Sequence, residues 1–456
     1  MKKSITIAIG LGACLMTLFW LRVLGQRPIT PTADAVELVQ KERKLAKQAG
    51  LPLTPAELPY HKTPPTQNLA TYLKQFSELD RKTKLTEDEK QLLYSRLLSW
   101  DKITPQETER AKLAFQKYQS LYDLIEKSSA CVAYSVPIRW SSTTYIDSAM
   151  DFPQKAVLRG QARWILARTT LLLTERRYAE AAKNALMGLK FAHLSEKENP
   201  TLIDLLVAQA VRAIVLKGVQ KVLYEARDVP DVVKELAKEL ERVPLPAPMS
   251  QAVPVETLMQ LNFLQDIKAN ALTKKNPLEV LGEIRDAKVN WKRYGYISKD
   301  KSAVDRYCAL SEAYLLQGMR DALKSLAEPY YLGIKGARPM IAKLEAHADA
   351  PESFFADIAL TCLKSGRKQA SAVAKQSVTT IMAQVMVWKT RHGRFPDNLT
   401  EIYKEVPVDP FDGKPMRYRK EEGGFTVWSV GETLKYDGRA TKQNESVIYF
   451  HPPTTK

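Results

Sequence analysis

Signals for helix starts and stops recur along most of this chain of 456 residues, and they constrain its fold more than any other feature. Thr86 and Glu89 have the spacing of a capping box. Thr104 and Glu107 form a second one, with a proline at the first helical position. Apolar residues recur at helical spacing behind both boxes, and a further helix is expected behind Thr201. The pattern predicts a mainly α protein, built as an irregular array of helices.

Shifts in composition and proline-containing boundaries divide the chain into five segments. We expect a signal anchor or transmembrane helix in residues 1–25, a Pro-rich stalk in residues 26–65 and a helical domain in residues 66–250. A second helical region is expected in residues 251–370, and a separate C-terminal domain in residues 371–456. The length suffices for several domains that each bury a core.

Residues 159–193 have the pattern of a helical hairpin. Tyr178 and Ala181 lie where the second helix would begin, and a small residue there lets two helices approach closely. The first helix would bury an apolar set of residues: Ala162, Trp164, Ile165, Leu171 and Leu172. The pattern resembles one tetratricopeptide repeat (TPR), although no second copy follows at a fixed period. We therefore expect one TPR-like pair within the array.

The C-terminal stretch from Ser371 to Phe450 changes character along its length. An amphipathic helix comes first, followed by two loops that contain proline and glycine, residues 392–399 and 408–415. Strand-like runs follow at residues 416–419 and 425–430, and residues 446–450 could supply a third strand. This order predicts a small α+β domain in which a three-stranded antiparallel sheet packs on the helix. Its expected core contains Trp388, Tyr418, Phe425 and Val427.

The C-terminal motifs resemble the globular end of the type II secretion pseudopilins, especially the major one. They are His-Gly-Arg-Phe-Pro-Asp-Asn-Leu at 392–399, Asp-Pro-Phe-Asp-Gly-Lys-Pro at 409–415 and Gly-Phe-Thr-Val-Trp-Ser-Val-Gly at 424–431. In that family the domain directly follows an N-terminal hydrophobic helix, whereas residues 26–370 intervene here. The usual start of the family's N-terminus is also missing. Assembly into a pilus is therefore not expected.

The resemblance also implies a calcium site. Major pseudopilins bind calcium in the loop that corresponds to residues 431–438, where Glu432 and Asp437 could supply carboxylate ligands. Basic residues crowd the same loop, and the family's further aspartates are replaced. Calcium is the one cofactor that the sequence suggests.

An apolar run from Ile5 to Leu21 follows Lys2 and Lys3. Its length is at the short edge of a membrane-spanning helix and also fits the core of a signal peptide. We favour an uncleaved signal anchor that spans the cytoplasmic membrane of a bacterium once and leaves the bulk of the chain outside. Two alternatives stay open: cleavage after Gly25, and lipidation of Cys14 in a lipobox-like sequence.

Composition and residue spacing argue against a nucleic-acid partner, a metal cluster and the common catalytic motifs. The formal net charge of +17 is spread over the chain without a Lys/Arg block, so no nucleic acid is expected as a partner. The four cysteines are widely separated, and the five histidines have no metal-ligand spacing. The sequence contains no Gly-x-Ser-x-Gly elbow and no phosphate-binding loop. No catalytic residue is identified.

Two functional interpretations remain. The first is a membrane-anchored extracytoplasmic interaction or scaffold protein with a protein partner, and the absence of motifs favours it. The alternative is an exported enzyme acting on polysaccharide or cell wall, with its site scattered over the helical body. The whole arrangement also loosely resembles uncharacterised exported proteins of Planctomycetes-like bacteria, a resemblance that implies no activity. Partner identity and oligomeric state cannot be inferred from the sequence.

Overall fold

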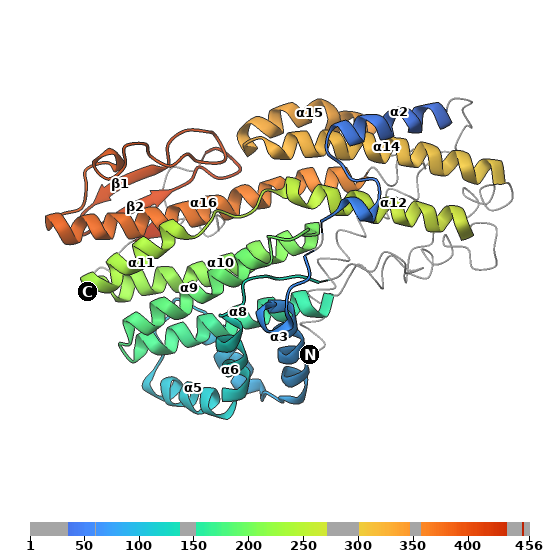
Figure 1. Cartoon of the computed structure of the whole chain (residues 1–456). Helices are drawn as coiled ribbons and strands as arrows, with labels where there is room; N and C mark the ends of the chain where they lie inside the picture. The colour runs from blue at the N-terminus through green and yellow to red at the C-terminus, as the bar shows by residue number, and fades with distance from the viewer. Residues whose placement is uncertain are drawn as a thin grey trace. The chain divides into compact units, whose positions relative to one another are not determined.

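The computed structural model describes residues 35–59, 61–136, 152–270, 301–346, 357–435 and 449–450. The described residues are mainly helical, with one small antiparallel sheet (Figure 1). The chain forms two compact units. Unit 1 comprises residues 1–60, 137–151 and 248–366, and unit 2 comprises residues 61–136, 152–247 and 367–456. The C-terminal segment therefore shares its unit with the first helical domain, where the sequence analysis expected a separate domain.

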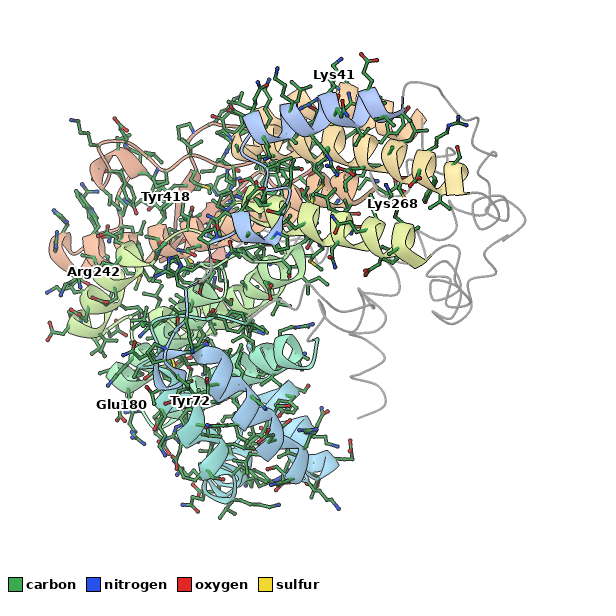
Figure 2. All side chains as sticks on the ribbon, turned by 45° about the vertical axis from the view of Figure 1, so that its right-hand side comes forward. Lys41, Tyr72, Glu180, Arg242, Lys268 and Tyr418 are labelled. Carbon is green, nitrogen blue, oxygen red and sulfur yellow. The ribbon has the colours of Figure 1, made fainter. Side chains whose placement is uncertain are left out.

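The described part of unit 1 is helical. Its elements are α2 (Ala35–Gln48), η1 (Pro55–Glu57), η4 (Met249–Ala252), α12 (Val253–Asn270), α14 (Lys301–Ala327), α15 (Tyr330–Ala346) and the first part of α16 (Asp357–His392). Helix α14 packs against α2, α12 and α15 (Figures 1 and 2).

Helix α2 lies within residues 26–65, for which the sequence analysis expected a stalk. Its buried residues Ala35, Glu42 and Ala46 lie on one side of the helix. The Glu42 carboxylate accepts a hydrogen bond of 2.7 Å from Arg320 of α14. Because α2 has a face that packs and pairs in this way, it docks onto α14.

Unit 2 contains most of the sequence-predicted helix starts. Its helices are α3 (Leu69–Lys82), α4 (Glu87–Gln91), the π-helical turn η3 (Leu92–Arg96), α5 (Pro105–Lys117), α6 (Gln119–Ser128), α8 (Phe152–Thr174), α9 (Tyr178–Leu194), α10 (Leu202–Glu225), α11 (Pro230–Arg242) and the rest of α16, with short turns at η2 (Pro65–Gln67) and η6 (Leu399–Glu401). Both predicted capping boxes are confirmed at Thr86 and Thr104. A third closes between Thr201 and Asp204.

Helices α8, α9 and α10 pack tightly against one another (Figure 1). Ala181 is completely buried and Ala179 is exposed, so the start of α9 presents a small residue to its neighbours. At Gly188 of α9, an added Cβ would lie 2.3 Å from Cγ1 of Val215 on α10. Small residues therefore set how closely these helices approach.

The sheet follows α16 in unit 2. Strand β1 (Arg417–Glu421) pairs antiparallel with β2 (Gly424–Trp428), and Tyr418 lies opposite Val427. The two-residue strand β3 (Tyr449–Phe450) pairs with the other edge of β2. Gly423 links β1 to β2 with φ +72°, a backbone conformation that favours glycine.

Phe425 and Val427 are completely buried in the core of this segment. The Phe425 ring lies 5.9 Å from that of Tyr418 and 5.2 Å from that of Phe395. Trp388, which the sequence analysis placed in the same core, stacks on His392 of its own helix, with ring centroids 3.8 Å apart. Phe395, which the sequence analysis did not name, is thus an aromatic neighbour of Phe425.

Candidate functional site

The turn at residues 409–415 is organised around the carboxylate of Asp409, which is completely buried. It accepts hydrogen bonds from the backbone N–H groups of Phe411 (3.0 Å) and Val430 (2.8 Å). It also accepts one from the Ser429 hydroxyl at 2.9 Å. The Asp-Pro-Phe turn and the Ser-Val-Gly end of the third motif are therefore bonded to each other.

Arg417 at the start of β1 supplies the positive charge of this turn. Its guanidinium donates to Asp409 at 2.8 Å and also pairs with Asp412. Burial acts to raise the pKa of Asp412, but the hydrogen bond from Arg417 and the backbone N–H of Lys414 outweigh it, so the pKa of that carboxyl is lowered. One guanidinium thus bridges the two carboxylates.

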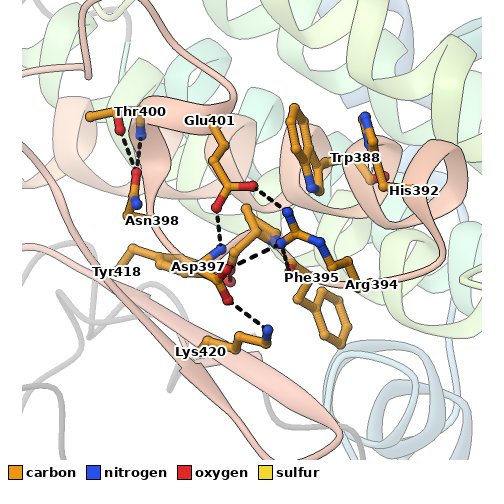
Figure 3. Close-up of polar contacts among 11 residues, drawn as sticks. Trp388, His392, Arg394, Phe395, Asp397, Asn398, Thr400, Glu401, Tyr418 and Lys420 are labelled. Carbon is orange, nitrogen blue, oxygen red and sulfur yellow. Dashed lines mark hydrogen bonds and ion pairs between the residues drawn. The ribbon is translucent and has the colours of Figure 1, made fainter.

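The loop after α16 carries a second polar network (Figure 3). Arg394 donates to Glu401 at 2.9 Å, and Glu401 accepts from the backbone N–H of Asp397 at 2.6 Å. Asp397 also pairs with Lys420 of β1 at 2.7 Å, and the Tyr418 hydroxyl donates to the Pro396 carbonyl at 2.8 Å. These bonds fix the loop to the sheet.

Of the two candidate calcium ligands, the structure describes Glu432 alone. Glu432 accepts a hydrogen bond of 2.7 Å from Arg367 of α16, and Asp437 lies outside the described residues. A cation at Glu432 would compete with this guanidinium for the carboxylate. Among the described residues, no group of three or more His, Cys, Asp or Glu side chains could hold a metal ion. The calcium site stays a prediction.

A buried polar cluster around Arg212 of α10 connects the residues after α9 to α16 within unit 2. The guanidinium of Arg212, completely buried, donates two hydrogen bonds to Glu196, at 3.0 and 2.6 Å. It also donates to the side chain of Gln376 on α16 at 2.7 Å and to the Pro244 carbonyl at 3.1 Å. The sequence analysis missed this cluster. Its signal was an arginine next to Val211 on the apolar side of α10.

His193 lies close to this ion pair. Burial lowers the pKa of His193 from 6.5 to about 4, and the positive charges of Lys197 and Arg212 add to the effect. The imidazole is therefore neutral in the folded protein at neutral pH.

Lys221 is a second perturbed group, in the packing of α10 against α8. Burial lowers its pKa from 10.5 to about 8, with a further contribution from the charge of Lys217. The amine donates to the Thr170 hydroxyl at 2.9 Å and to the Leu97 carbonyl at 3.2 Å. Because Leu97 ends the π-helical turn η3, Lys221 caps that turn.

Within the part of the chain that the structure describes, the remaining features do not assemble a reaction centre. Cys131, Cys308 and Cys362 are buried free thiols. A hollow in unit 1 is lined mostly by proline, leucine and glycine, with Lys47 and Glu57 as its charged residues. None of the helices in the described ranges is long and apolar enough to cross a membrane.

Comparison with known proteins gives no match to this chain. No protein-family model matches it, and no curated protein or solved structure does. The geometry of the chain itself therefore carries the functional argument.

Proposed function

We propose that this protein is a membrane-anchored extracytoplasmic scaffold that holds a protein partner on its helical body. In this proposal, residues 5–21 form the anchor, and α8 and α9 act as a TPR-like pair. The C-terminal segment, with β3 as its third strand, is a pseudopilin-like end that extends the body.

The observation that carries the proposal is the buried tie between α10 and α16. Arg212 joins Glu196 to Gln376, and Gln376 in turn donates to the carbonyl groups of Val243 and Pro244, both at 3.0 Å. A buried charge that loses its partner is costly, so this network resists separation of the C-terminal helix from the body. A rigid helical body of this kind suits a scaffold whose surface binds a protein partner.

The hydrogen bonds to the buried Asp409 carboxylate support the pseudopilin-like part of the proposal. The motifs that carry the resemblance, at residues 409–415 and 424–431, bond to each other through one carboxylate. Because the two motifs are bonded through this carboxylate, they form one structural unit, which is consistent with their occurrence in one segment.

Labelling of single cysteines in intact spheroplasts tests the orientation. Ala179→Cys introduces a thiol at an exposed position of α9, and a membrane-impermeant maleimide should label it if the body is extracytoplasmic. Ala181→Cys is the matched control, because Ala181 is buried and should react only after denaturation. Labelling of Ala179→Cys only after the membrane is lysed would place the body in the cytoplasm.

Cross-linking in native membranes followed by purification of the full chain tests the scaffold role. We expect a defined protein to be recovered in a constant ratio to the chain. Arg212→Met, which disrupts the tie to α16 without changing the surface, should reduce that recovery. Recovery of polysaccharide fragments without a protein partner would favour the alternative of an exported enzyme.

A further inference from the structure

Helix α2 is the first described element of the chain, and the predicted anchor ends at Leu21. The linker of residues 22–34 spans at most about 45 Å when fully extended. Helix α2 is therefore held close to the membrane surface if residues 5–21 span the bilayer. The inference below rests on that proposed anchoring.

Helix α2 has paired charges where it meets α14 and exposed lysines elsewhere on its surface. Glu42 is buried and paired with Arg320, and Arg43 donates to Glu312 of α14 at 3.0 Å. These two pairs neutralise charges where α2 meets α14. The exposed basic residues that remain on α2 are Lys41, Lys44 and Lys47.

The three lysines share one side of the helix. With about 100° of rotation per residue, Lys41, Lys44 and Lys47 fall within an arc of about 120°. The buried residues Ala35, Glu42 and Ala46 lie on the opposite side. Figure 2 labels Lys41 on α2.

The same arc contains one exposed acidic residue, Glu37, in the first turn of α2. Three lysines against one glutamate leave the outward arc with a net positive charge. We define Lys41, Lys44 and Lys47 as the α2 basic face.

We propose that the α2 basic face binds the anionic phospholipid headgroups of the membrane that holds the anchor. Basic side chains beside an anionic bilayer are attracted within about one Debye length, about 8 Å at physiological salt. The linker raises the effective concentration of α2 at the surface, so a weak electrostatic contact suffices. The result is a body held against the bilayer in a defined orientation.

Lysine reactivity in reconstituted vesicles tests this contact. The full chain is inserted into vesicles of phosphatidylcholine alone or with one part in three of phosphatidylglycerol. A membrane-impermeant amine-acylating reagent is added, and modification of each lysine is measured by mass spectrometry. We expect phosphatidylglycerol to protect Lys41, Lys44 and Lys47, and 1 M NaCl to remove the protection. The exposed lysines 74, 82 and 84 of α3 and its C-terminal loop serve as internal references.

A single substitution sharpens the test. Lys44→Gln should lower the ratio of docked to undocked α2 by about fivefold, measured as lost protection at Lys41 and Lys47. Lys82→Gln is the matched control, because it removes one exposed charge from unit 2 and should leave that protection unchanged.

The outcomes separate the lipid contact from the anchor. Equal reactivity of the α2 basic face in both vesicle types overturns the lipid contact, and it does so whether or not the chain resists extraction by alkaline carbonate. Carbonate extraction of the chain from both vesicle types overturns the anchor instead. In that case the extracted chain is neutralised and mixed with vesicles that contain phosphatidylglycerol. Protection of Lys41, Lys44 and Lys47 then shows whether the α2 basic face binds anionic lipid.

Discussion

Asp409 is completely buried, yet its two carboxylate oxygens accept hydrogen bonds from two backbone N–H groups, a hydroxyl and a guanidinium. Burial of a charge is tolerated when its partners are complete. The same rule applies to Arg212, whose donors reach Glu196 and Gln376. Single buried charges of this kind organise unit 2 at the residue scale.

Asp409→Ala should destabilise the protein by about 3–5 kcal/mol, because the substitution leaves the buried N–H groups of Phe411 and Val430 without their acceptor and removes one of the two carboxylate partners of Arg417. Asp397→Ala removes an exposed ion pair with Lys420, which solvent screens, and should leave the denaturation midpoint nearly unchanged. Urea denaturation of both variants provides the comparison. Equal midpoints would show that the hydrogen bonds to Asp409 add no stability.

His193 gives a prediction about pH. Its pKa is lowered from 6.5 to about 4 by burial and by the charges of Lys197 and Arg212. Between these pH values the unfolded chain binds a proton that the folded chain excludes, so stability falls as pH falls from 6.5 towards 4. His193→Gln should therefore lose less stability than the wild type between pH 7.5 and pH 5 in urea denaturation. An equal loss in both proteins would exclude this contribution.

At the scale of elements, local hydrogen bonds determine where helices begin, and packing determines how closely the elements approach one another. The capping boxes at Thr86 and Thr104 fix where helices begin, because each pairs groups only three residues apart. The approach of α9 to α10 depends on a small residue at Gly188, and the sheet depends on burial of Phe425.

Ala181→Leu should destabilise the protein by about 1–3 kcal/mol, because the larger side chain overpacks a completely buried position of α9. Ala179 lies on the exposed side of the same helix, so Ala179→Leu should be tolerated. Chemical denaturation of the two variants measures the difference. Identical midpoints would argue against a close helix pair at residues 178–182.

Phe425→Ala should cost about 3 kcal/mol or more, the usual range for removing a buried aromatic ring. The loss should be local, because the neighbours of the ring, Phe395 and Tyr418, belong to the same segment. Hydrogen exchange of the full chain should show faster exchange in β1 and β2. Unchanged protection of these strands would refute the packing.

At the scale of the whole molecule, the chain is divided into two compact units whose segments are not contiguous in sequence. Unit 2 takes its helical body from residues 61–136 and 152–247 and its end from residues 367–456. The Arg212 cluster is a point at which these distant segments meet.

Arg212→Met should cost about 3–5 kcal/mol, because it leaves Glu196 as an unpaired buried charge. The double variant with Glu196→Gln should recover part of that loss, since the charge is then removed. Hydrogen exchange around Gln376 on α16 reports whether the tie is broken. If the double variant were no more stable than Arg212→Met alone, the unpaired charge would not be the cause.

The sequence by itself determined the mainly helical class, the capping boxes, the strand-like runs after α16 and the small residues at the start of α9. These features depend on groups within a few residues of one another, so local patterns were sufficient to predict them.

Only the tertiary structure decided which distant residues meet. Arg212 and Gln376 are 164 positions apart, and Asp409 and Ser429 are 20 apart. The docking of α2 onto α14 likewise brings together segments that are distant in the sequence. Such pairings depend on how whole helices pack, because a buried charge takes its partner from whichever segment the fold brings within about 3 Å.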